Sequence, residues 1–394
     1  MPAPRDDSEH SPREHTLRDR RARARLDRRA QAVVVAVAVI AGIIAAALGT
    51  RPESAARALA PATATTVKPT PSKPKTVLFA HVNPKHHLDL LVVAGIRAGG
   101  QVGSVVFVPT TTLVQVPAFD TQALVDLPKL GASSLLATTI SNALGIHFDQ
   151  VTVVGDKQLT ALLAPARRFD VTFVRSAQVD DSAGTLAFSR GRAHISASDA
   201  TRLLIGNDSA GALEHLVTVQ AVLQGWFNRL RYGPAVGRAT MKVSKDARSL
   251  VALAHADVVF DTLPVDTLSS GSIARYELRQ PDADNLVRAD FGYALFTPGK
   301  RLRVEVLNGT GAIALTQAVA RRVVPAGGEI TLTGNVPGFG VRHTQVVYFR
   351  TADLPEARRL AAALGVGSVA QGNVPLDVVD LSVVVGSDFH PTRR

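Results

Sequence analysis

The chain has 394 residues, which is enough for two folded domains and further segments at about 100 to 200 residues per domain. Its content of 46% hydrophobic and 20% charged residues excludes disorder of the whole chain, and the absence of cysteine excludes disulfide frameworks and thiolate metal sites. The formal net charge of +11 favours anionic partners such as nucleic acid, anionic lipids or phosphorylated polymers, without selecting one of them.

Residues 1–50 have the pattern of a membrane anchor. Residues 1–29 form a basic tail with seven arginines between Arg18 and Arg29, and residues 30–50 carry no charge. An uncharged helix of about 20 residues crosses a hydrocarbon core of about 30 Å. Because positive residues stay on the cytoplasmic side, we expect a single-pass signal anchor in the cell membrane. Its N-terminus would be cytoplasmic and the later domains extracytoplasmic.

Two other interpretations of this segment remain open. A cleaved signal peptide would fit the small residues Ala58 and Ala60, although the apolar core of such peptides usually has about 7 to 15 residues. A nucleic-acid-binding arm would fit the arginines, but no aromatic residues for base stacking lie among them, so we expect no nucleic-acid partner. Residues 51–75 follow as a linker of Pro, Ala, Thr and Lys that spaces the folded part from the bilayer.

Residues 76–296 alternate strand and helix patterns. Three apolar, β-branched runs bounded by Gly, Pro or Asn predict buried strands: TVLFAHV from Thr76, then LDLLVVAGI and SVVFVP. Apolar residues recur at helical spacing from Ser209 to Leu230, where Trp226 is expected in the core. Ser198 is the predicted N-cap of the shorter helix before it. This alternation predicts a mixed α/β domain.

A composition break near Pro298 precedes a second predicted domain, residues 301–390. The domain starts with a strand and an Asn-Gly turn, and helices are predicted at Ile313–Val324 and Leu354–Leu364 among further strands. The order of these elements predicts a small βαββαβ unit.

This second domain resembles the C-terminal domain that accompanies the LytR-CpsA-Psr proteins, a bacterial cell-envelope family. Four motifs at the expected separations carry the resemblance: VEVLNGTG at Val304–Gly311, Gly334-Asn335, TQVVY at Thr344–Tyr348, and VVVGSDF at Val383–Phe389. The resemblance covers about residues 301 to 390.

Residues 76–296 resemble a diverged copy of the catalytic domain of the same family. The matching features are an opening strand, Asp89 after a polar loop, a strand that ends at Pro109, Leu144-Gly145-Ile146 before Phe148-Asp149, the Gly191–Asp199 turn into a helix, and the long helix with Gln220. The resemblance implies a three-layer domain with a mixed sheet. It also implies a site that binds a polyprenyl-pyrophosphate-linked glycan through arginines and an acid-held Mg²⁺, and that transfers the glycan phosphate to peptidoglycan.

The chain departs from the family pattern where those charges are expected. Pro109-Thr110-Thr111 stands where the family has Pro-Arg-Asp, and Ala80-His81-Val82 replaces Gly-Ser-Asp. Arg202 alone remains of an Arg-x-Arg run, and Leu213-Glu214-His215-Leu216 replaces an arginine pair at the start of the long helix. Because phosphoryl transfer depends on cations that stabilise the oxyanion charge, we expect a weakened or lost transferase centre.

The charged residues that remain form the candidate site. Asp89 and Asp208 are the candidate catalytic residues, and Asp89 is also the candidate ligand of a Mg²⁺ ion. The candidate ligand-binding residues are Arg190, Arg192 and Arg202.

A cluster around Asp89 has a second interpretation. Neutral imidazoles with a carboxylate could hold a transition metal. The residues concerned are His81, Lys85, His86, His87 and Asp89. Their spacing matches no standard metal motif, which favours a solvated polar loop.

The leading hypothesis is a membrane-anchored cell-envelope protein that binds a polyprenyl-linked or wall glycopolymer, with a weakened or lost transferase centre. One alternative is an active Mg²⁺-dependent phosphotransferase that attaches glycans to peptidoglycan. The other is a membrane-tethered interaction module without a glycan ligand, which a core lacking an apolar tunnel would support. The sequence assigns no oligomeric state.

Overall fold

The computed structural model describes residues 73, 75–208, 210–244, 246–270, 273–373 and 378–391. The described residues all belong to one compact unit, Lys68–Arg394. The predicted tail 1–29, the membrane helix 30–50 and most of the linker 51–75 therefore lie outside the described residues. Within the described ranges, no helix has the length and apolarity needed to cross a membrane.

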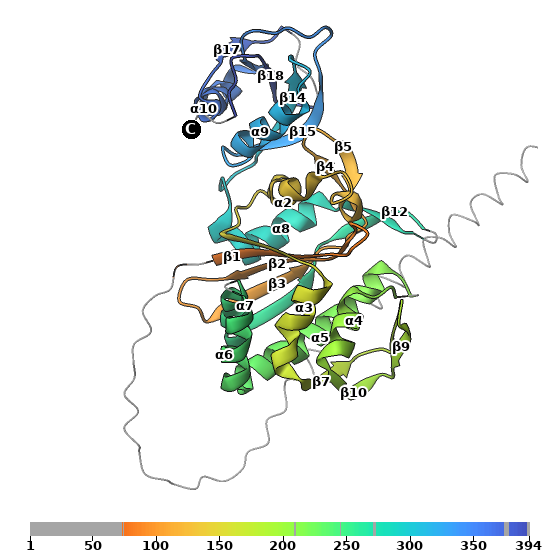
Figure 1. Ribbon diagram of the computed structural model, residues 1–394. Coiled ribbons are helices and arrows are strands. Elements are labelled where there is room, and N and C mark those ends of the chain that lie inside the picture. The colour runs from red at the N-terminus through yellow and green to blue at the C-terminus, as the bar shows by residue number, and fades with distance from the viewer. Residues whose placement is uncertain are drawn as a thin grey trace, which may run out of the picture. The chain divides into compact units, whose positions relative to one another are not determined.

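A five-stranded mixed sheet forms the centre of the middle domain, in the order β11-β3-β2-β1-β6 (Figure 1). β1 pairs antiparallel with β2 and parallel with β6, so the sheet has both kinds of pairing. The three predicted apolar strands are confirmed as β1, β2 and β3, and their nearly continuous apolar runs fit a sheet that is covered on both faces. The strands are β1 Lys75–Val82, β2 Leu88–Ile96, β3 Val102–Phe107, β6 Gln150–Val154 and β11 Asp257–Thr262.

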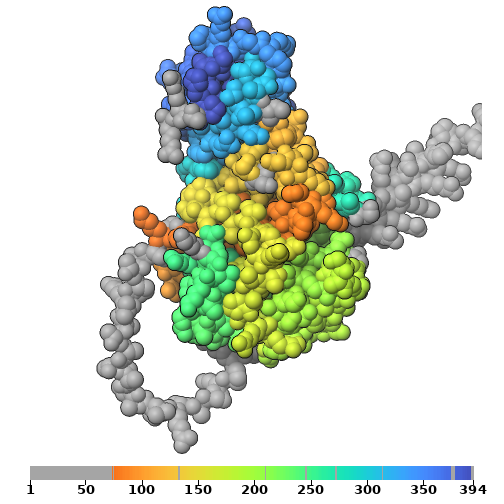
Figure 2. Space-filling model, in the orientation of Figure 1, coloured from red at the N-terminus to blue at the C-terminus, as the bar shows by residue number. Residues whose placement is uncertain are grey.

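Helices cover both faces of this sheet and give the expected three layers (Figure 1). One core lies between the sheet and α3, α4, α5 and α7, and a second lies between the opposite face and α2 and α8. α3 lies beside α6 on the face seen in Figure 2. The helices are α2 Leu136–Leu144, α3 Asp156–Leu163, α4 Ala197–Ile205, α5 Ala212–Tyr232, α6 Pro234–Val243, α7 Ala247–His255 and α8 Gln280–Phe291.

Three smaller sheets complete the middle domain. A four-stranded sheet has the order β12-β13-β4-β5, and the pairs β7–β10 and β8–β9 are antiparallel. Their strands are β4 Thr112–Val116, β5 Asp120–Ala123, β7 Arg168–Phe173, β8 Ala177–Asp181, β9 Gly184–Phe188, β10 Gly191–Ser196, β12 Val265–Ser269 and β13 Arg275–Leu278. Single-turn 3-10 helices of this domain lie at Leu124–Asp126, Ala132–Leu135, Ala164–Ala166 and Gly292–Ala294. Another, Thr351–Asp353, lies in the C-terminal domain.

Two predicted features before the long helix were wrong. The Gly191–Asp199 segment is not a turn but strand β10 followed by the start of α4. The N-cap of α4 is Ser196 rather than Ser198, because Ser196 forms a capping box with Asp199. A capping box needs an acidic or amide side chain three residues after the cap, and Asp199 stands at that distance only from Ser196.

The C-terminal domain is a five-stranded sheet in the order β15-β14-β18-β16-β17, with its own core. Its strands are β14 Leu302–Asn308, β15 Gly328–Asn335, β16 Gln345–Tyr348, β17 Ser368–Gln371 and β18 Leu381–Val385, and its helices are α9 Ile313–Val323 and α10 Leu354–Leu364. β17 is absent from the predicted βαββαβ order. It is a four-residue edge strand with polar residues at both ends, so it carries little apolar signal.

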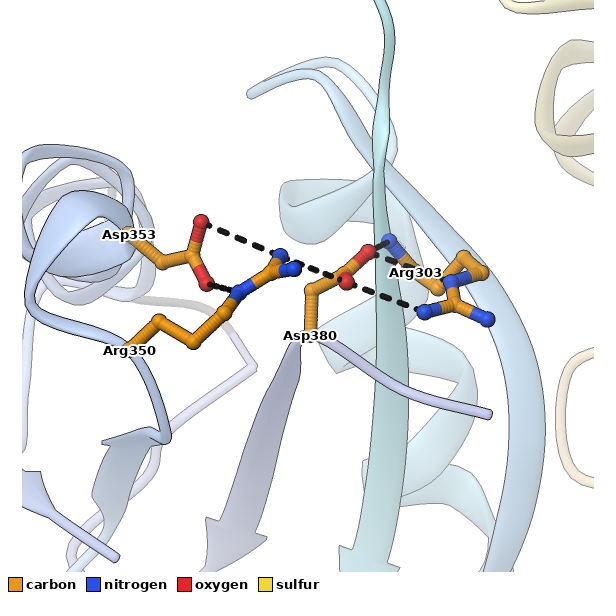
Figure 3. A network of polar contacts seen from close by, with 4 residues as sticks. All are labelled: Arg303, Arg350, Asp353 and Asp380. Atoms are coloured by element: carbon orange, nitrogen blue, oxygen red, sulfur yellow. Dashed lines mark hydrogen bonds and ion pairs between the residues drawn. The ribbon is translucent and has the colours of Figure 1, made fainter. Parts of the chain in front are cut away.

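An ion-pair network links the strands of this domain (Figure 3). Buried Asp380, just before β18, pairs with Arg303 on β14 at 3.0 Å and with Arg350 at 2.9 Å. Arg350 also pairs with Asp353 at 2.8 Å, directly before α10. Three segments that are distant in sequence are thereby held together around one carboxylate.

Buried hydrogen bonds connect the C-terminal domain to α2. The side chain of Asn142 on α2 donates to the carbonyl of Ile330 and accepts from its N–H, each at 2.8 Å. Arg301 donates to the carbonyls of Asn142 and Ala143 at the end of α2 and pairs with Glu329 at 3.4 Å. Ile330 lies on β15, at the edge of the sheet. The side chain of Asn142 therefore forms the hydrogen bonds with its backbone that a neighbouring strand would otherwise form.

Candidate functional site

A fully buried histidine stands at the end of β1. The pairing of β1 with β2 shifts register between His81 and Val82, and His81 has no exposed surface. Its Nε2 atom is 2.9 Å from Oδ1 of Asp156, the first residue of α3. Its Nδ1 atom is 3.3 Å from Oδ2 of Asp89 on β2, close enough for an ion pair but not aligned for a hydrogen bond. Two strands and a helix thus bring two carboxylates to one imidazole.

The polar loop between β1 and β2 is organised by Asn83. Its side-chain amide donates to Oδ1 of Asp89 at 3.0 Å, and its carbonyl oxygen accepts from the backbone N–H groups of Lys85 and His87. Lys85 and His86 are exposed to solvent. Residues 83–87 therefore fit a solvated polar loop, whereas His81 is buried on β1 and Asp89 lies on β2.

The residues around Asp89 do not fit a Mg²⁺ ion. Mg²⁺ requires about six oxygen ligands in octahedral geometry. Asn83 donates to one oxygen of Asp89 and the imidazole of His81 lies 3.3 Å from the other, and in the described part of the chain no three His, Asp or Glu side chains come together to hold a metal. A metal role for Asp89 therefore stays a prediction without a matching donor set.

A second polar cluster lies between the end of β7 and the start of α5. Nη2 of Arg175 donates to Oδ2 of Asp208 at 2.7 Å and to the carbonyl of Glu214. The side chain of Asp208 is 2% exposed, and its Oδ1 atom accepts from the N–H of Ala210 at 2.9 Å. Arg175 therefore neutralises the buried carboxylate of Asp208.

His215 in the first turn of α5 connects the two clusters. Burial lowers its pKa, while a contact of Nε2 with the carbonyl of Leu204 at 3.4 Å and the negative charges of Asp208 and Asp89 act in the opposite direction. The charge of Arg175 also lowers this pKa, and the Nδ1 atom is buried without a hydrogen-bond partner. The charges of the predicted pair Asp89 and Asp208 thus both act on the imidazole of His215.

The predicted arginines do not belong to this group. Arg192 on β10 pairs with Asp170 on β7 at 2.8 Å, and Arg202 on α4 binds Asp181 through two hydrogen bonds of 2.6 and 3.0 Å. These contacts raise the pKa values of both arginines and lower those of the two aspartates. Arg190 lies in the exposed turn before β10. Arg192 and Arg202 are thus engaged by local acids.

The apolar interior offers little space for a ligand chain. An apolar cavity lies between the central sheet and α3, α5 and α7 and measures about 20 Å³. A volume of about 10 to 15 Å³ on this measure holds one water molecule. Trp226 lines this cavity and is 2% exposed, which confirms its predicted place in the core. At this size the cavity has no room for a prenyl chain.

Sequence reasoning placed His81 near Asp89 but missed three other members of these clusters: Asp156, Arg175 and His215. His81 and His215 are visible in the sequence as replacements of family residues, which is the one signal that could have selected them. Arg175 and Asp156 stand in no motif, and only the packing of β7, α3 and α5 shows what they contact.

Several solved structures are similar to about half of this chain. TagV of B. subtilis is 14% identical with a TM-score of 0.47, covering 56% of this chain and 98% of its own. A transcriptional regulator from Enterococcus faecalis is 12% identical with a TM-score of 0.45, covering 56% and 88%. TagT bound to LI-WTA is 14% identical with a TM-score of 0.44, covering 56% and 91%. Likenesses at this level assign no function.

No curated protein matches the sequence of the chain. A family model described as LytR cell envelope-related transcriptional attenuator matches residues 301–389. This range coincides with the sheet β14–β18 and its two helices, and it contains all four motifs noted in the sequence. Residues 301–389 are therefore a LytR C-terminal domain, a member of the family described as LytR cell envelope-related transcriptional attenuator.

Proposed function

We propose that this protein is a cell-envelope component that binds a wall glycopolymer without transferring it. The match of residues 301–389 to a cell-envelope family supports the compartment. The closed pair of Arg175 and Asp208 carries the rest of the proposal, because Arg175, whose charge acts on His215, is already neutralised inside the protein.

Transfer of a glycan phosphate would need cations that are not already paired with carboxylates of the protein. The enzyme gains most of its rate from positioned positive charges that stabilise the phosphoryl oxygens. Arg192, Arg202 and Arg175 each bind an aspartate of this chain instead. Opening any of these pairs for a substrate would leave a carboxylate beside the incoming phosphate.

The small size of the apolar cavity favours the wall polymer over its polyprenyl-linked precursor. A prenyl chain needs a long apolar cavity, whereas the space beside Leu90 and Trp226 is about the size of one water molecule. We therefore expect the polymer to be recognised through its glycan and not through a lipid.

Binding is tested with the detergent-solubilised full chain. Its affinity is measured by calorimetry for purified wall polymer and, separately, for vesicles that contain polyprenyl phosphate. We expect binding to the polymer and none to the polyprenyl phosphate beyond that of vesicles without it. Absence of affinity for the polymer would contradict the proposal.

The active-transferase alternative is tested by turnover. The full chain is incubated with Mg²⁺, polyprenyl-pyrophosphate-linked glycan and peptidoglycan, and product is compared for wild type and Asp89→Ala. We expect equal rates close to zero. Turnover in the wild type that Asp89→Ala abolishes would establish the enzyme and overturn our proposal.

A second candidate is an interaction module without a glycan ligand, which the small size of the apolar cavity also favours. It predicts that the chain binds neither polymer nor lipid. For either candidate we propose the single-pass topology expected from residues 1–50. A reporter fused after Arg394 should be extracytoplasmic, and cytosolic reporter activity would contradict this topology.

A further inference from the structure

Three parallel strands of the LytR C-terminal domain end at the same edge of its sheet. β14 ends at Asn308, β15 at Asn335 and β18 at Val385, and both neighbours run parallel to β14. Ligands of open α/β sheets commonly bind at the carboxyl ends of such strands. The sequence motifs of this domain converge on the same edge, although the proposed function of the middle domain makes no use of them.

The loop of residues 336–343, here called the edge loop, is held firmly against this edge. The N–H groups of Gly340 and Val341 donate to the carbonyl of Gly309 at 2.9 and 3.0 Å. Val341 and Arg342 in turn accept from Ser387 and Asp388, at 3.0 and 3.1 Å. The edge loop is thus hydrogen-bonded to the segments after both β14 and β18.

Glycine allows this close packing. A Cβ atom on Gly309 would lie 2.6 Å from the side chain of Val341 and 2.7 Å from the carbonyl oxygen of Val385. One on Gly386 would lie 2.6 Å from the backbone of His343. Gly309 and Gly386 therefore allow the edge loop to pack closely against the sheet edge, where the loop is exposed to solvent.

Phe339 at the tip of the edge loop is 61% exposed, and its ring lies flat on the turn after β14. A Cβ atom on Gly311 would meet three adjacent ring carbons, Cγ, Cδ1 and Cε1, at the same 3.5 Å. A point equidistant from three adjacent atoms of a hexagon lies on the axis of the ring, so Gly311 faces the ring plane and not its edge. The opposite face of the ring is directed away from this contact.

Exposed basic side chains follow Phe339 in the edge loop. Arg342 is exposed, and within the described ranges its guanidinium has no ion-pair partner. The side chain of His343 is 83% exposed and lies 3.6 Å from Oδ2 of Asp388. The carboxylate of Asp388 is itself engaged by two hydrogen bonds from Thr344. The edge loop therefore combines a supported aromatic face with an unpaired positive charge.

We propose that Phe339, Arg342 and His343 form a binding surface for an anionic glycan. A sugar ring would stack on the free face of Phe339, and a phosphate or carboxylate of the same polymer would bind Arg342, with His343 beside it. A stable protein interface buries about 800 Å² per partner, whereas in the edge loop Phe339 is the large apolar side chain that is exposed, next to exposed glycines, Arg342 and His343. The proposal does not require the middle domain to bind glycan.

The test uses the full chain and purified cell-wall sacculi that carry their anionic polymers. Cosedimentation is compared for wild type, Phe339→Ala and Arg342→Gln. We expect each variant to bind about three to ten times more weakly, the range that corresponds to one stacking or charge-assisted contact. On sacculi stripped of anionic polymers by acid extraction, the wild type should bind more weakly and Arg342→Gln should make no further difference.

Matched controls separate this surface from general effects. Tyr232→Ala removes an aromatic side chain that is 78% exposed on the middle domain, and Arg358→Gln removes an exposed cation on α10. Both should bind sacculi like the wild type, and all variants should melt at the same temperature. His215→Ala reports separately on the middle domain. Unchanged binding by Phe339→Ala and Arg342→Gln would overturn the proposal, as would undiminished wild-type binding to stripped sacculi.

Discussion

At the residue scale, the middle domain contains both a buried and an exposed ion pair. Asp208 is almost completely buried and depends on Arg175, whereas Asp170 and Arg192 are both half exposed or more. Removing one partner of a buried pair leaves an uncompensated group away from water, while an exposed pair contributes about 0 to 1 kcal/mol. The two pairs should therefore respond differently to the same substitution.

We expect Asp208→Asn to lower the free energy of unfolding by about 2 kcal/mol, because the amide keeps the hydrogen bond from Ala210 but loses the charge that Arg175 requires. Asp170→Asn is the matched control and should change it much less, because its pair with Arg192 is exposed to solvent. Denaturant unfolding at neutral pH measures both values. Equal effects would contradict the assignment of Asp208 as a buried, compensated charge.

His215 should make the stability of the protein depend on pH. Its pKa is lowered by burial, so the unfolded chain takes up a proton near pH about 6.5 that the folded chain does not yet accept. The free energy of unfolding should therefore fall as the pH drops below about 6.5. His215→Gln, which retains a donor toward Leu204, should remove this part of the pH dependence. His194→Gln, at an exposed position, should leave it unchanged.

At the element scale, Asp380 ties the elements of the C-terminal domain together. Burial alone would raise its pKa, but the hydrogen bonds and charges of Arg303 and Arg350 outweigh burial and hold the pKa below its ordinary value. A carboxylate with a lowered pKa stabilises the folded state above the ordinary value of about 3.9. That contribution is lost as the pH falls through the folded-state pKa.

Asp380→Asn should consequently destabilise the protein at pH 7 and do so progressively less below pH about 4. Thermal unfolding of both proteins between pH 2.5 and 7, with the fold verified by circular dichroism, measures the difference. Asp282→Asn, in the exposed pair with Arg279, is the control and should show little difference at any pH. A constant difference across this range would mean that packing and not charge explains the effect.

At the scale of the whole molecule, the two domains share buried hydrogen bonds. Asn142 satisfies both backbone groups of Ile330, and Arg301 binds the last carbonyls of α2. Buried backbone groups without partners cost about 1 to 3 kcal/mol each. The LytR C-terminal domain is therefore coupled to the middle domain through specific contacts and not only through the chain.

Asn142→Leu should weaken this coupling. We expect a loss of about 2 kcal/mol or more, because the N–H and C=O of Ile330 lose their partners. Calorimetry should show the unfolding of the two domains separating into distinct transitions. Asn285→Leu, on the exposed side of α8, should leave the unfolding profile unchanged. A variant profile identical to wild type would contradict the coupling.

The order of most elements and the family of the C-terminal domain could be predicted from the sequence alone. The spacing of apolar residues and the positions of turn residues are local properties of the chain. TVLFAHV from Thr76 became a buried strand, Leu354–Leu364 is a helix with the predicted limits, and the LytR motifs mark the domain that the family model matches. Short polar segments such as β17 have no such local signal, and their pairing comes from the neighbouring strand.

The tertiary structure alone decided which charges meet. From the sequence, Arg192 and Arg202 were candidates to bind a phosphate. In the structure they form ion pairs with Asp170 and Asp181. Arg175 and His215 belong to no motif, and yet they surround Asp208. Sequence pattern determines which side chains are available, whereas the electrostatics of a site depends on distances between segments that only the packed fold brings together.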